Sequence, residues 1–343
     1  MSAKSDIVLV SGGAGYIGSH VAHLLRASGF TPMVVDSLVN GHGFAAGPGF
    51  RQGDIADTAL IRALVRDLRP VAALHFAAFI EVGESVAKPA KYFENNRDKA
   101  KIFFDTLASE GVDKIVFSST AAVYGEGDGL LTEAHALQPV NPYGQSKLAA
   151  EEYLRGLPGM ASVTLRYFNV AGAAPEAGLG EAHFPESHLM PRIVMPLIGL
   201  PEKLLAALGL DKGFAIYGDD YDTRDGSAVR DYVHVLDIAQ AHVAALRYLI
   251  AGGKSDIFNL GSSKGTSVKE IVAAARSVLA RPDFSPPTLP RRAGDPAMLV
   301  ANSDKAQGVL GWRATRSIGE MIESAAAWHR SETYRNAILG RLA

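Results

Sequence analysis

The sequence has 343 residues, of which 48% are hydrophobic and 20% charged, a composition typical of a globular protein with a sizeable core. Its formal net charge of -2 is too balanced for a nucleic-acid-binding protein, which needs a basic face to neutralise phosphates. The lack of cysteine excludes disulfides, thiolate zinc sites and cysteine nucleophiles, and it fits a cytoplasmic location.

The N-terminus and the hydropathy pattern indicate neither a signal peptide nor a membrane segment. Met1 to Asp6 is short and polar, and the apolar run Ile7–Val10 is too brief for a signal peptide. No stretch approaches the roughly 18 apolar residues that a membrane-spanning helix needs. We therefore expect no membrane partner.

The first half of the chain alternates short apolar runs with helical patterns. Ile7–Val10 reads as a strand buried on both faces, and a glycine-rich turn leads from it into a helix from Tyr16 to Ser28 that Gly29 ends. This alternation predicts an α/β fold with a doubly wound parallel sheet and helices on both faces. The other predicted elements are strands at Met33–Val35, Val71–His75, Ile115–Ser118 and Val163–Tyr167, helices at Ala56–Leu68, 89–110 and 143–156, and a loop at 37–53.

The second half is less regular. Loops rich in proline, glycine and acidic residues fill 172–226, and shorter helices are predicted at 234–251, 267–280 and 317–329. We interpret this half as a smaller α/β lobe that carries substrate contacts.

A glycine-rich turn follows the first strand. Gly12, Gly15 and Gly18 have the spacing G-x-x-G-x-x-G at the mouth of the first helix. Glycine is needed there because the turn is tight, the backbone approaches a pyrophosphate, and the helix packs close to the strand. The pyrophosphate then lies against free N–H groups at the helix N-terminus. The pattern predicts a dinucleotide site.

A carboxylate follows at the end of the second predicted strand. Asp36 lies 18 residues beyond Gly18 (36 minus 18), where it can accept hydrogen bonds from both ribose hydroxyls and would repel a 2′-phosphate. The turn and Asp36 together favour NAD over NADP. The alternative is a glycine turn with an unrelated surface aspartate, and Asp54 can likewise be an ordinary N-terminal helix residue.

These features predict two domains. A Rossmann-type NAD-binding domain is expected over 1–170, with later segments at about 230–260 returning to it. The remainder, 171–343, is expected to form mainly the smaller substrate-binding lobe.

Tyr143 and Lys147 form a Y-x-x-x-K pattern preceded by Asn141-Pro142. Proline suits a helix start, so the two side chains are expected one turn apart on one face. The pKa of a phenol is ordinarily about 10, too high for a base at neutral pH. A nearby ammonium and the positive charge of oxidised nicotinamide would lower it, and Tyr143 could then remove a hydroxyl proton as hydride leaves the same carbon. An exposed helix pair is the alternative.

Hydroxyl residues strengthen the catalytic interpretation. Phe117-Ser118-Ser119-Thr120 lies at the carboxyl end of a predicted parallel strand, the edge at which open α/β sheets collect ligands. The Thr120 hydroxyl can bond the reacting substrate oxygen and assist proton transfer. A Ser/Thr turn that caps the next segment is the alternative.

Further motifs accompany these. They are His75-Phe76-Ala77-Ala78, Val82-Gly83-Glu84-Ser85-Val86 with Asn95-Asn96, Leu165-Arg166-Tyr167-Phe168-Asn169, Gly226-Ser227-Ala228-Val229-Arg230-Asp231-Tyr232-Val233-His234-Val235, Arg291-Arg292-Ala293-Gly294-Asp295 and Leu310-Gly311-Trp312. With the glycine turn, Asp36, the hydroxyl cluster and the Tyr–Lys pattern, they resemble the extended short-chain dehydrogenase/reductase superfamily. Within it they resemble the UDP-glucose (UDP-galactose) 4-epimerases, over about residues 6 to 330.

The resemblance implies that Tyr143 is the catalytic base, that Lys147 lowers its pKa, and that Thr120 is the hydroxyl partner. It also implies an NAD site. Its residues would be Gly12, Gly15, Tyr16, Ile17, Gly18, Asp36, Ser37, Leu38, Asn40, Asp54, Ile55, Phe76, Ala77, Ala78, Asn95, Tyr143, Lys147 and Phe168.

A UDP-sugar site is implied as well, with Thr120, Tyr143, Asn169, His188, Leu189, Tyr217, Arg230, Arg292 and Asp295 as its residues. The two arginines make independent sense, because forked guanidinium donors suit a pyrophosphate. Leu299 aligns with the position that limits the size of the sugar C2 substituent, and Ile80 stands where some epimerases place a lysine beside the cofactor. The resemblance also implies a homodimer, and we assign no metal site.

The expected function is therefore NAD-dependent epimerisation at C4 of a UDP-hexose through a 4-keto sugar, in galactose metabolism. The alternatives are another nucleotide-sugar epimerase (acting on a UDP-N-acetylhexosamine or a UDP-pentose), a sugar-nucleotide 4,6-dehydratase or decarboxylase, or a non-catalytic NAD-binding regulator. A dehydratase needs an added acid and base, usually Asp-Glu after the hydroxyl residue, whereas Ala121-Ala122 follow Thr120 here. The intact Thr120, Tyr143 and Lys147 argue against a regulator.

Overall fold

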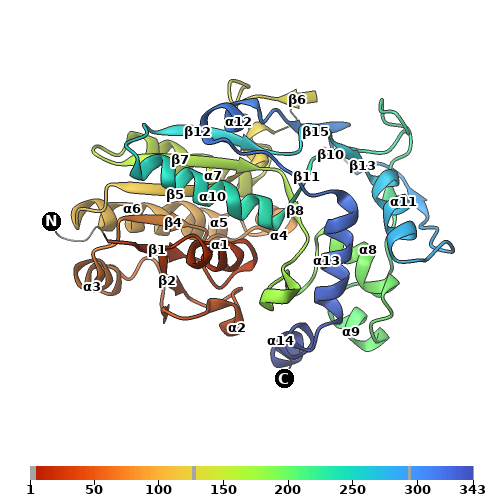
Figure 1. The fold of residues 1–343 in the computed structure, drawn as a ribbon. Helices are drawn as coiled ribbons and strands as arrows, with labels where there is room; N and C mark the ends of the chain where they lie inside the picture. Colours follow the sequence, from red (N-terminus) through yellow and green to blue (C-terminus); the bar gives the residue numbers. More distant parts are fainter. Residues whose placement is uncertain (1–4, 126–128, 293–294, 343) are drawn as a thin grey trace.

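The computed structural model describes residues 5–125, 129–292 and 295–342, and one large parallel sheet dominates it (Figure 1). The sheet contains seven strands: β1 (Ile7–Ser11), β2 (Thr31–Asp36), β3 (Phe50–Gln52), β4 (Ala72–His75), β5 (Lys114–Thr120), β7 (Ala161–Tyr167) and β12 (Asp256–Leu260). Their order is β12-β7-β5-β4-β1-β2-β3, and each neighbouring pair is parallel. The predicted strands are confirmed, with ends that differ by at most two residues.

Helices cover both faces of this sheet (Figure 1). One face packs against α1 (Tyr16–Ala27), α10 (Val235–Ile250) and α12 (Asp304–Leu310). The opposite face packs against α3 (Thr58–Leu68), α6 (Ala100–Ser109) and α7 (Pro142–Gly156). Because both faces are covered, the central strands are continuous apolar runs. The doubly wound Rossmann-type sheet is therefore confirmed.

The strand order reverses direction between β1 and β4. The chain moves outward from β1 through β2 to β3, then crosses back to β4 and continues through β5 to β7. In open α/β sheets, the crevice at the carboxyl ends of two such strands is where ligands bind. The site is therefore expected beside the ends of β1 and β4.

Two predictions in the first half are wrong in detail. The predicted loop at 37–53 contains α2 (Gly43–Ala46) and the edge strand β3, which is short and largely exposed and so has no apolar run to betray it. The predicted helix at 89–110 consists of α5 (Pro89–Tyr92), a π-helical segment η1 (Phe93–Lys99) and α6. The helix α4 (Val82–Ala87) ends just before Pro89, because proline disfavours helical backbone at the preceding residue.

The second half forms a smaller α/β lobe. Its helices are α8 (Leu189–Leu197), α9 (Glu202–Ala207), α11 (Val268–Val278), α13 (Ile318–Arg330) and α14 (Glu332–Leu342). A four-stranded sheet contains β13 (Thr266–Ser267), β10 (Val229–Arg230), β15 (Met298–Ala301) and β6 (Gly129–Leu131) in that order. Two strand pairs complete the lobe: β8 (Asn169–Ala171) with β11 (Tyr232–His234), and β9 (Ile216–Tyr217) with β14 (Thr288–Leu289). Among the described residues, short 3₁₀ helices form at η2 (Ala121–Tyr124) and η3 (Pro175–Ala177).

The predicted helices at 234–251, 267–280 and 317–329 correspond to α10, α11 and α13. The sequence pattern missed α8 because Pro191 and Pro196 interrupt it; Pro191 lies in the first turn, where no N–H is needed. α10 and β12 pack with the large sheet, while the division of the chain at residue 170 stays a prediction. Among the described residues, the helices are all too short or too polar to cross a bilayer.

Candidate active site

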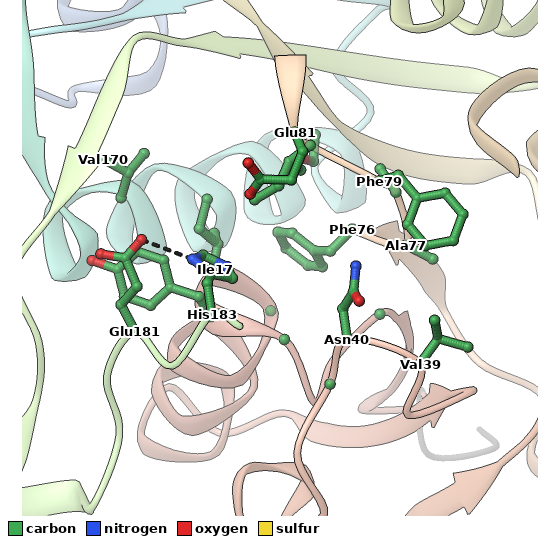
Figure 2. A pocket seen from close by; sticks show the side chains of 18 of the residues that line it. Ile17, Val39, Asn40, Phe76, Ala77, Phe79, Glu81, Val170, Glu181 and His183 are labelled. Atoms are coloured by element: carbon green, nitrogen blue, oxygen red, sulfur yellow. Dashed lines mark hydrogen bonds and ion pairs between the residues drawn. The ribbon is translucent and has the colours of Figure 1, made fainter. Parts of the chain in front are cut away.

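A cavity of about 1110 Å³ lies at the carboxyl ends of β1 and β4 (Figure 2). It exceeds the roughly 300–1,000 Å³ of typical small-molecule pockets, so it has room for a dinucleotide and a second ligand. Figure 2 shows Val39 and Asn40, from the loop after β2, opposite Phe76 and Ala77, which follow β4. The cavity is therefore at the position that the sheet topology favours.

The predicted cofactor residues gather in this cavity. Leu38 is the exception: its N–H donates to Asp36, but it does not line the cavity wall. The predicted residues that do line it are Gly12, Gly15, Tyr16, Ile17, Gly18, Asp36, Ser37, Asn40, Asp54, Ile55, Phe76, Ala77, Ala78, Asn95, Tyr143, Lys147 and Phe168. Their individual roles stay predictions.

The glycine turn leaves open backbone where a diphosphate would lie. Gly12 has a φ of +70°, and a Cβ there would collide with the backbone of Ala77. A Cβ on Gly18 would collide with the backbone of Gly12. The twelve-residue helix α1 begins after Gly15, at the cavity, and has no side-chain cap. Its first N–H groups therefore remain available to a ligand. These features fit a dinucleotide diphosphate.

Replacing Gly18 with alanine is expected to destabilise the protein by about 1–3 kcal/mol, because the new methyl group forces the turn apart. NAD affinity should fall about tenfold or more, measured by calorimetric titration. The matched control is Gly308→Ala in α12, where an added Cβ meets open space. A Gly18→Ala protein that binds NAD as tightly as the Gly308→Ala control would contradict the assigned turn.

Asp36 is held in place at the end of β2. Its Oδ2 accepts from Ala14 N at 3.0 Å and its Oδ1 from Leu38 N at 2.8 Å. Burial raises the pKa of Asp36, and these two N–H groups oppose the shift. Each carboxylate oxygen keeps a second lone pair, so the arrangement fits a ribose diol.

The predicted Tyr–Lys pair lies at the start of α7. Asn141 caps the helix by accepting from Gly144 N at 2.9 Å, and Tyr143 and Lys147 follow one turn apart, as predicted. Lys147 is 2% exposed, and its Nζ lies 4.3 Å from the centroid of the Phe117 ring. Burial lowers the pKa of Lys147 to about 7, although the charge of Glu151 opposes this.

The groups of the protein alone raise the pKa of Tyr143. Burial raises it, and a hydrogen bond with Thr120 opposes the rise only in part. Desolvation of the phenolate dominates for the groups of the protein alone, and the predicted lowering, which includes the positive charge of oxidised nicotinamide, stays a prediction. A positive charge inside the cavity is required to reverse the direction. Thr120 also accepts from Ala122 N at 3.1 Å, so its hydroxyl caps η2 and contacts the phenol at once.

A buried ion pair lies one turn beyond Lys147. Glu151 is 4% exposed and receives two donors from the guanidinium of Arg166, with Nη2 at 2.6 Å and Nε at 3.1 Å. Ser119 donates to the same carboxylate. The sequence analysis gave these residues no role. The negative charge of Glu151 favours the protonated form of Lys147. The ion pair with Arg166 holds Glu151 in the position where it has this effect.

The predicted substrate residues divide into two groups. Thr120, Tyr143, Asn169, His188 and Leu189 line the cavity, together with Ile80 and Leu299. Tyr217, Arg230, Arg292 and Asp295 do not line it, but they lie together. The Arg292 guanidinium is 3.8 Å from the Tyr217 ring centroid, Asp295 N donates to Arg292 O at 3.3 Å, and Arg230 forms an ion pair with Asp295.

This second group is adjacent to the cavity. Arg230 is paired with Leu299 across β10 and β15, and Leu299 lines the cavity wall. Ala293 and Gly294 of the quoted motif lie outside the described residues.

Arg341 of α14 is a further cavity residue that the sequence analysis missed. It donates to Gly41 O at 2.9 Å and Val39 O at 3.3 Å, on either side of Asn40. The resemblance ended near residue 330 and gave no signal here. α14 itself is anchored by Tyr334 and Ile338, which are both fully buried.

Replacing Arg341 with alanine should release the loop after β2 and raise the NAD dissociation constant about threefold to tenfold, equivalent to ~1 kcal/mol of lost hydrogen bonding. Calorimetric titration with NAD measures this. Arg335→Ala is the matched control, because Arg335 lies on the same helix and its guanidinium donates to Arg330 O, outside the loop after β2. Equal NAD affinity in the two variants would contradict the role of Arg341.

Comparisons with known proteins agree with this geometry. A family model described as the NAD dependent epimerase/dehydratase family matches residues 8–261. The UDP-glucose 4-epimerase of Rhizobium meliloti (strain 1021) is 46% identical over 331 residues, 95% of this chain and 98% of that relative. The UDP-glucose 4-epimerase structure from Brucella ovis in complex with NAD has a TM-score of 0.86 at 41% identity, covering 93% of this chain and 97% of the other. One from Bifidobacterium longum in complex with NAD+ and UDP has a TM-score of 0.83 at 35% identity, covering 96% and 99%.

Proposed function

The chain belongs to the NAD dependent epimerase/dehydratase family, and we propose how the residues that line its cavity carry out the reaction. The reaction is the NAD-dependent epimerisation at C4 of a UDP-hexose, the interconversion of UDP-glucose and UDP-galactose. The observation that carries the proposal is that Tyr143, hydrogen-bonded to Thr120, lies in the same cavity as the glycine turn of Gly12 to Gly18.

We propose that Tyr143 takes the proton of the C4 hydroxyl and that Thr120 holds the same oxygen. Bound NAD supplies the hydride acceptor and the positive charge that the phenol needs. Lys147 stands one turn away and favours the phenolate when it is protonated. Loss of the hydroxyl proton to Tyr143 and of hydride from C4 leaves a 4-keto sugar. After the sugar has turned its other face, the same hydride would return to C4 while Tyr143 returns the proton to the oxygen.

The second group of predicted substrate residues, which contains two arginines, supports the anchoring of UDP. Rotation of the keto sugar requires firm contacts to the nucleotide and weak contacts to the hexose. Arg230 and Arg292 offer forked donors to a diphosphate, and Asp295 offers an acceptor for ribose hydroxyls. Their position beside Leu299 is consistent with a nucleotide that leads from the cavity outward.

The 4,6-dehydratase alternative is disfavoured at one position. Ala121 and Ala122 follow Thr120, and both line the cavity. A dehydratase needs an acid and a base beside C5 and C6, and methyl groups transfer no protons. The cavity wall after Thr120 therefore supports epimerisation.

The test is incubation of the purified protein with UDP-galactose, followed by chromatography of the products. UDP-glucose is expected at equilibrium with the substrate. A 4-keto-6-deoxy product, or the lack of any conversion, would contradict the proposal. A panel with UDP-N-acetylglucosamine and a UDP-pentose measures the sugar range that Leu299 permits.

We further propose, from the family resemblance, that the protein is a cytoplasmic homodimer of galactose metabolism. Light scattering after size-exclusion chromatography tests the oligomeric state directly. The expected mass is twice 36.3 kDa. A mass of 36.3 kDa at micromolar concentration would contradict the dimer.

A further inference from the structure

Four side chains from one short segment converge on the wall of the cavity. They are Glu181, His183, Glu186 and His188, which follow the sequence pattern E-x-H-x-x-E-x-H. One ligand atom from each lies within 4.8 Å of the others. Figure 2 shows the contact between Glu181 and His183 beside Ile17. We call these four residues the Glu/His cluster.

The distances within the Glu/His cluster resemble those between ligands of one ion. The Nδ1 atoms of His183 and His188 lie 3.0 and 2.8 Å from the same oxygen, Glu181 Oε1. His188 Nδ1 is also 3.4 Å from Glu186 Oε1. Ligands at ~2.0–2.2 Å in a tetrahedral zinc site are roughly 3.3–3.5 Å apart. To surround such an ion, the shortest separation of 2.8 Å has to open by about half an ångström, and separations of up to 4.8 Å have to close by about 1 Å.

The contacts among these side chains leave polar atoms unsatisfied. Glu186 is 2% exposed, and its Oε2 is buried with no hydrogen-bond partner among the described residues. His188 Nδ1 is likewise buried and makes no well-aligned hydrogen bond in the part of the chain that the structure describes. Buried polar atoms in folded proteins nearly always have partners. An ion pair brings His188 Nδ1 within 2.8 Å of Glu181 Oε1, but it leaves Glu186 Oε2 without a partner among the described residues, whereas a cation bound between them would give both atoms a ligand bond.

The backbone holds the segment in this arrangement. Trp328 Nε1 donates to Glu181 O at 2.7 Å, and His42 Nε2 donates to Ala182 O at 2.7 Å. Glu186 N donates to Leu208 O at 3.0 Å. The ligand atoms are therefore brought together by the fold, so the site requires little ordering when an ion binds.

We propose that the Glu/His cluster binds one divalent transition-metal ion of the zinc class. Two imidazole nitrogens and two carboxylate oxygens suit Zn²⁺ or Co²⁺, while Mg²⁺ and Ca²⁺ prefer oxygen ligands alone. The ion ties the segment 181–188 to the cavity wall. His188 also lines the cavity.

The test is titration of the full-length protein, stripped with a chelator and without NAD or sugar nucleotide, with Co²⁺. We expect one ion per chain, the visible absorption of tetrahedral Co²⁺, and its displacement by Zn²⁺. A lack of saturable binding at micromolar metal, or binding without that absorption, overturns the proposal. The readout needs no turnover, so it is independent of the epimerase reaction.

Variants locate the ion. His183→Gln and Glu186→Gln should each weaken Co²⁺ binding about tenfold or more, because each removes one ligand. The matched control His135→Gln changes an exposed histidine that contacts Thr132, and it should bind Co²⁺ as the unaltered protein does. Unchanged affinity in both ligand variants, or equal loss in the control, overturns the assignment. If a ligand variant does not fold, the titration of the unaltered protein still decides.

Discussion

Replacing Tyr143 with phenylalanine is expected to lower kcat for UDP-galactose about 10²–10⁴-fold, the usual contribution of a positioned base. The substitution removes one oxygen and keeps the ring, so the cavity wall and its apolar packing stay in place. The phenol is the group that Thr120 contacts at the carboxyl end of β5, and phenylalanine has no proton to exchange there. The measurement is the steady-state rate of UDP-glucose formation, with NAD affinity measured in parallel.

Tyr153→Phe is the matched control for this result. Tyr153 lies on the same helix, and its hydroxyl donates to Asp105 at an exposed position. It should retain the unaltered rate. If the Tyr143→Phe protein exchanged the sugars at the rate of this control, Tyr143 would not be the base.

Replacing Lys147 with methionine is expected to lower kcat by ~10²-fold and, in the same protein, to raise the free energy of unfolding at pH 7. Burial holds the pKa of Lys147 at about 7, well below its ordinary value. The folded protein therefore loses stability when this amine is protonated. Methionine has a similar shape and no charge, so the substitution removes that cost, with a gain of ~1 kcal/mol or more at pH 7. Chemical denaturation at matched NAD concentration measures it.

The pH dependence fixes the sign of this effect. Because the folded-state pKa of Lys147 is depressed, its destabilising contribution is fully present below about pH 7. The contribution fades as pH rises from about 7 towards the ordinary lysine value, since the folded protein then releases a proton that the unfolded chain still holds. The stability gain of Lys147→Met should therefore shrink above pH 7. Lys203→Met, at an exposed position, should show no such trend, and a gain in Lys147→Met that grows with pH would contradict the account.

The sequence predicted the large sheet well because its central strands are apolar on both faces. β1, β4, β5 and β7 are short hydrophobic runs whose register places their polar carboxyl ends at one edge. Gly12 and Gly18 were recognisable from their G-x-x-G-x-x-G spacing after the first strand, and the structure shows that a Cβ at either position would collide with backbone. Patterns of this kind reflect packing within a short segment, so they can be recognised from the sequence alone.

What the sequence did not predict depends on contacts between distant segments. β3 exists because it pairs with β2, and its own residues are largely exposed. Arg341 reaches the cofactor loop across 300 residues of chain (341 minus 41), which no local pattern records. The upward effect of burial on the pKa of Tyr143 was not predicted, because the degree of burial of a phenol is a property of the fold.

The Glu/His cluster could be predicted from the sequence only in part. Its four residues are close in sequence, and His188 was assigned to the substrate on resemblance alone. Glu181 and Glu186 lie close to both histidines because backbone contacts to Trp328 and Leu208 hold the segment in place. The spacing of the four residues in the sequence does not predict this arrangement.

The most direct test of the account uses UDP-galactose that carries deuterium at C4. The account predicts that the UDP-glucose formed by the purified protein in ordinary water keeps the deuterium at C4, because the hydride leaves and returns within one cavity while Tyr143 exchanges only the hydroxyl proton. Mass spectrometry and proton NMR of the product measure its position. Replacement of the deuterium by solvent hydrogen during conversion would contradict the account.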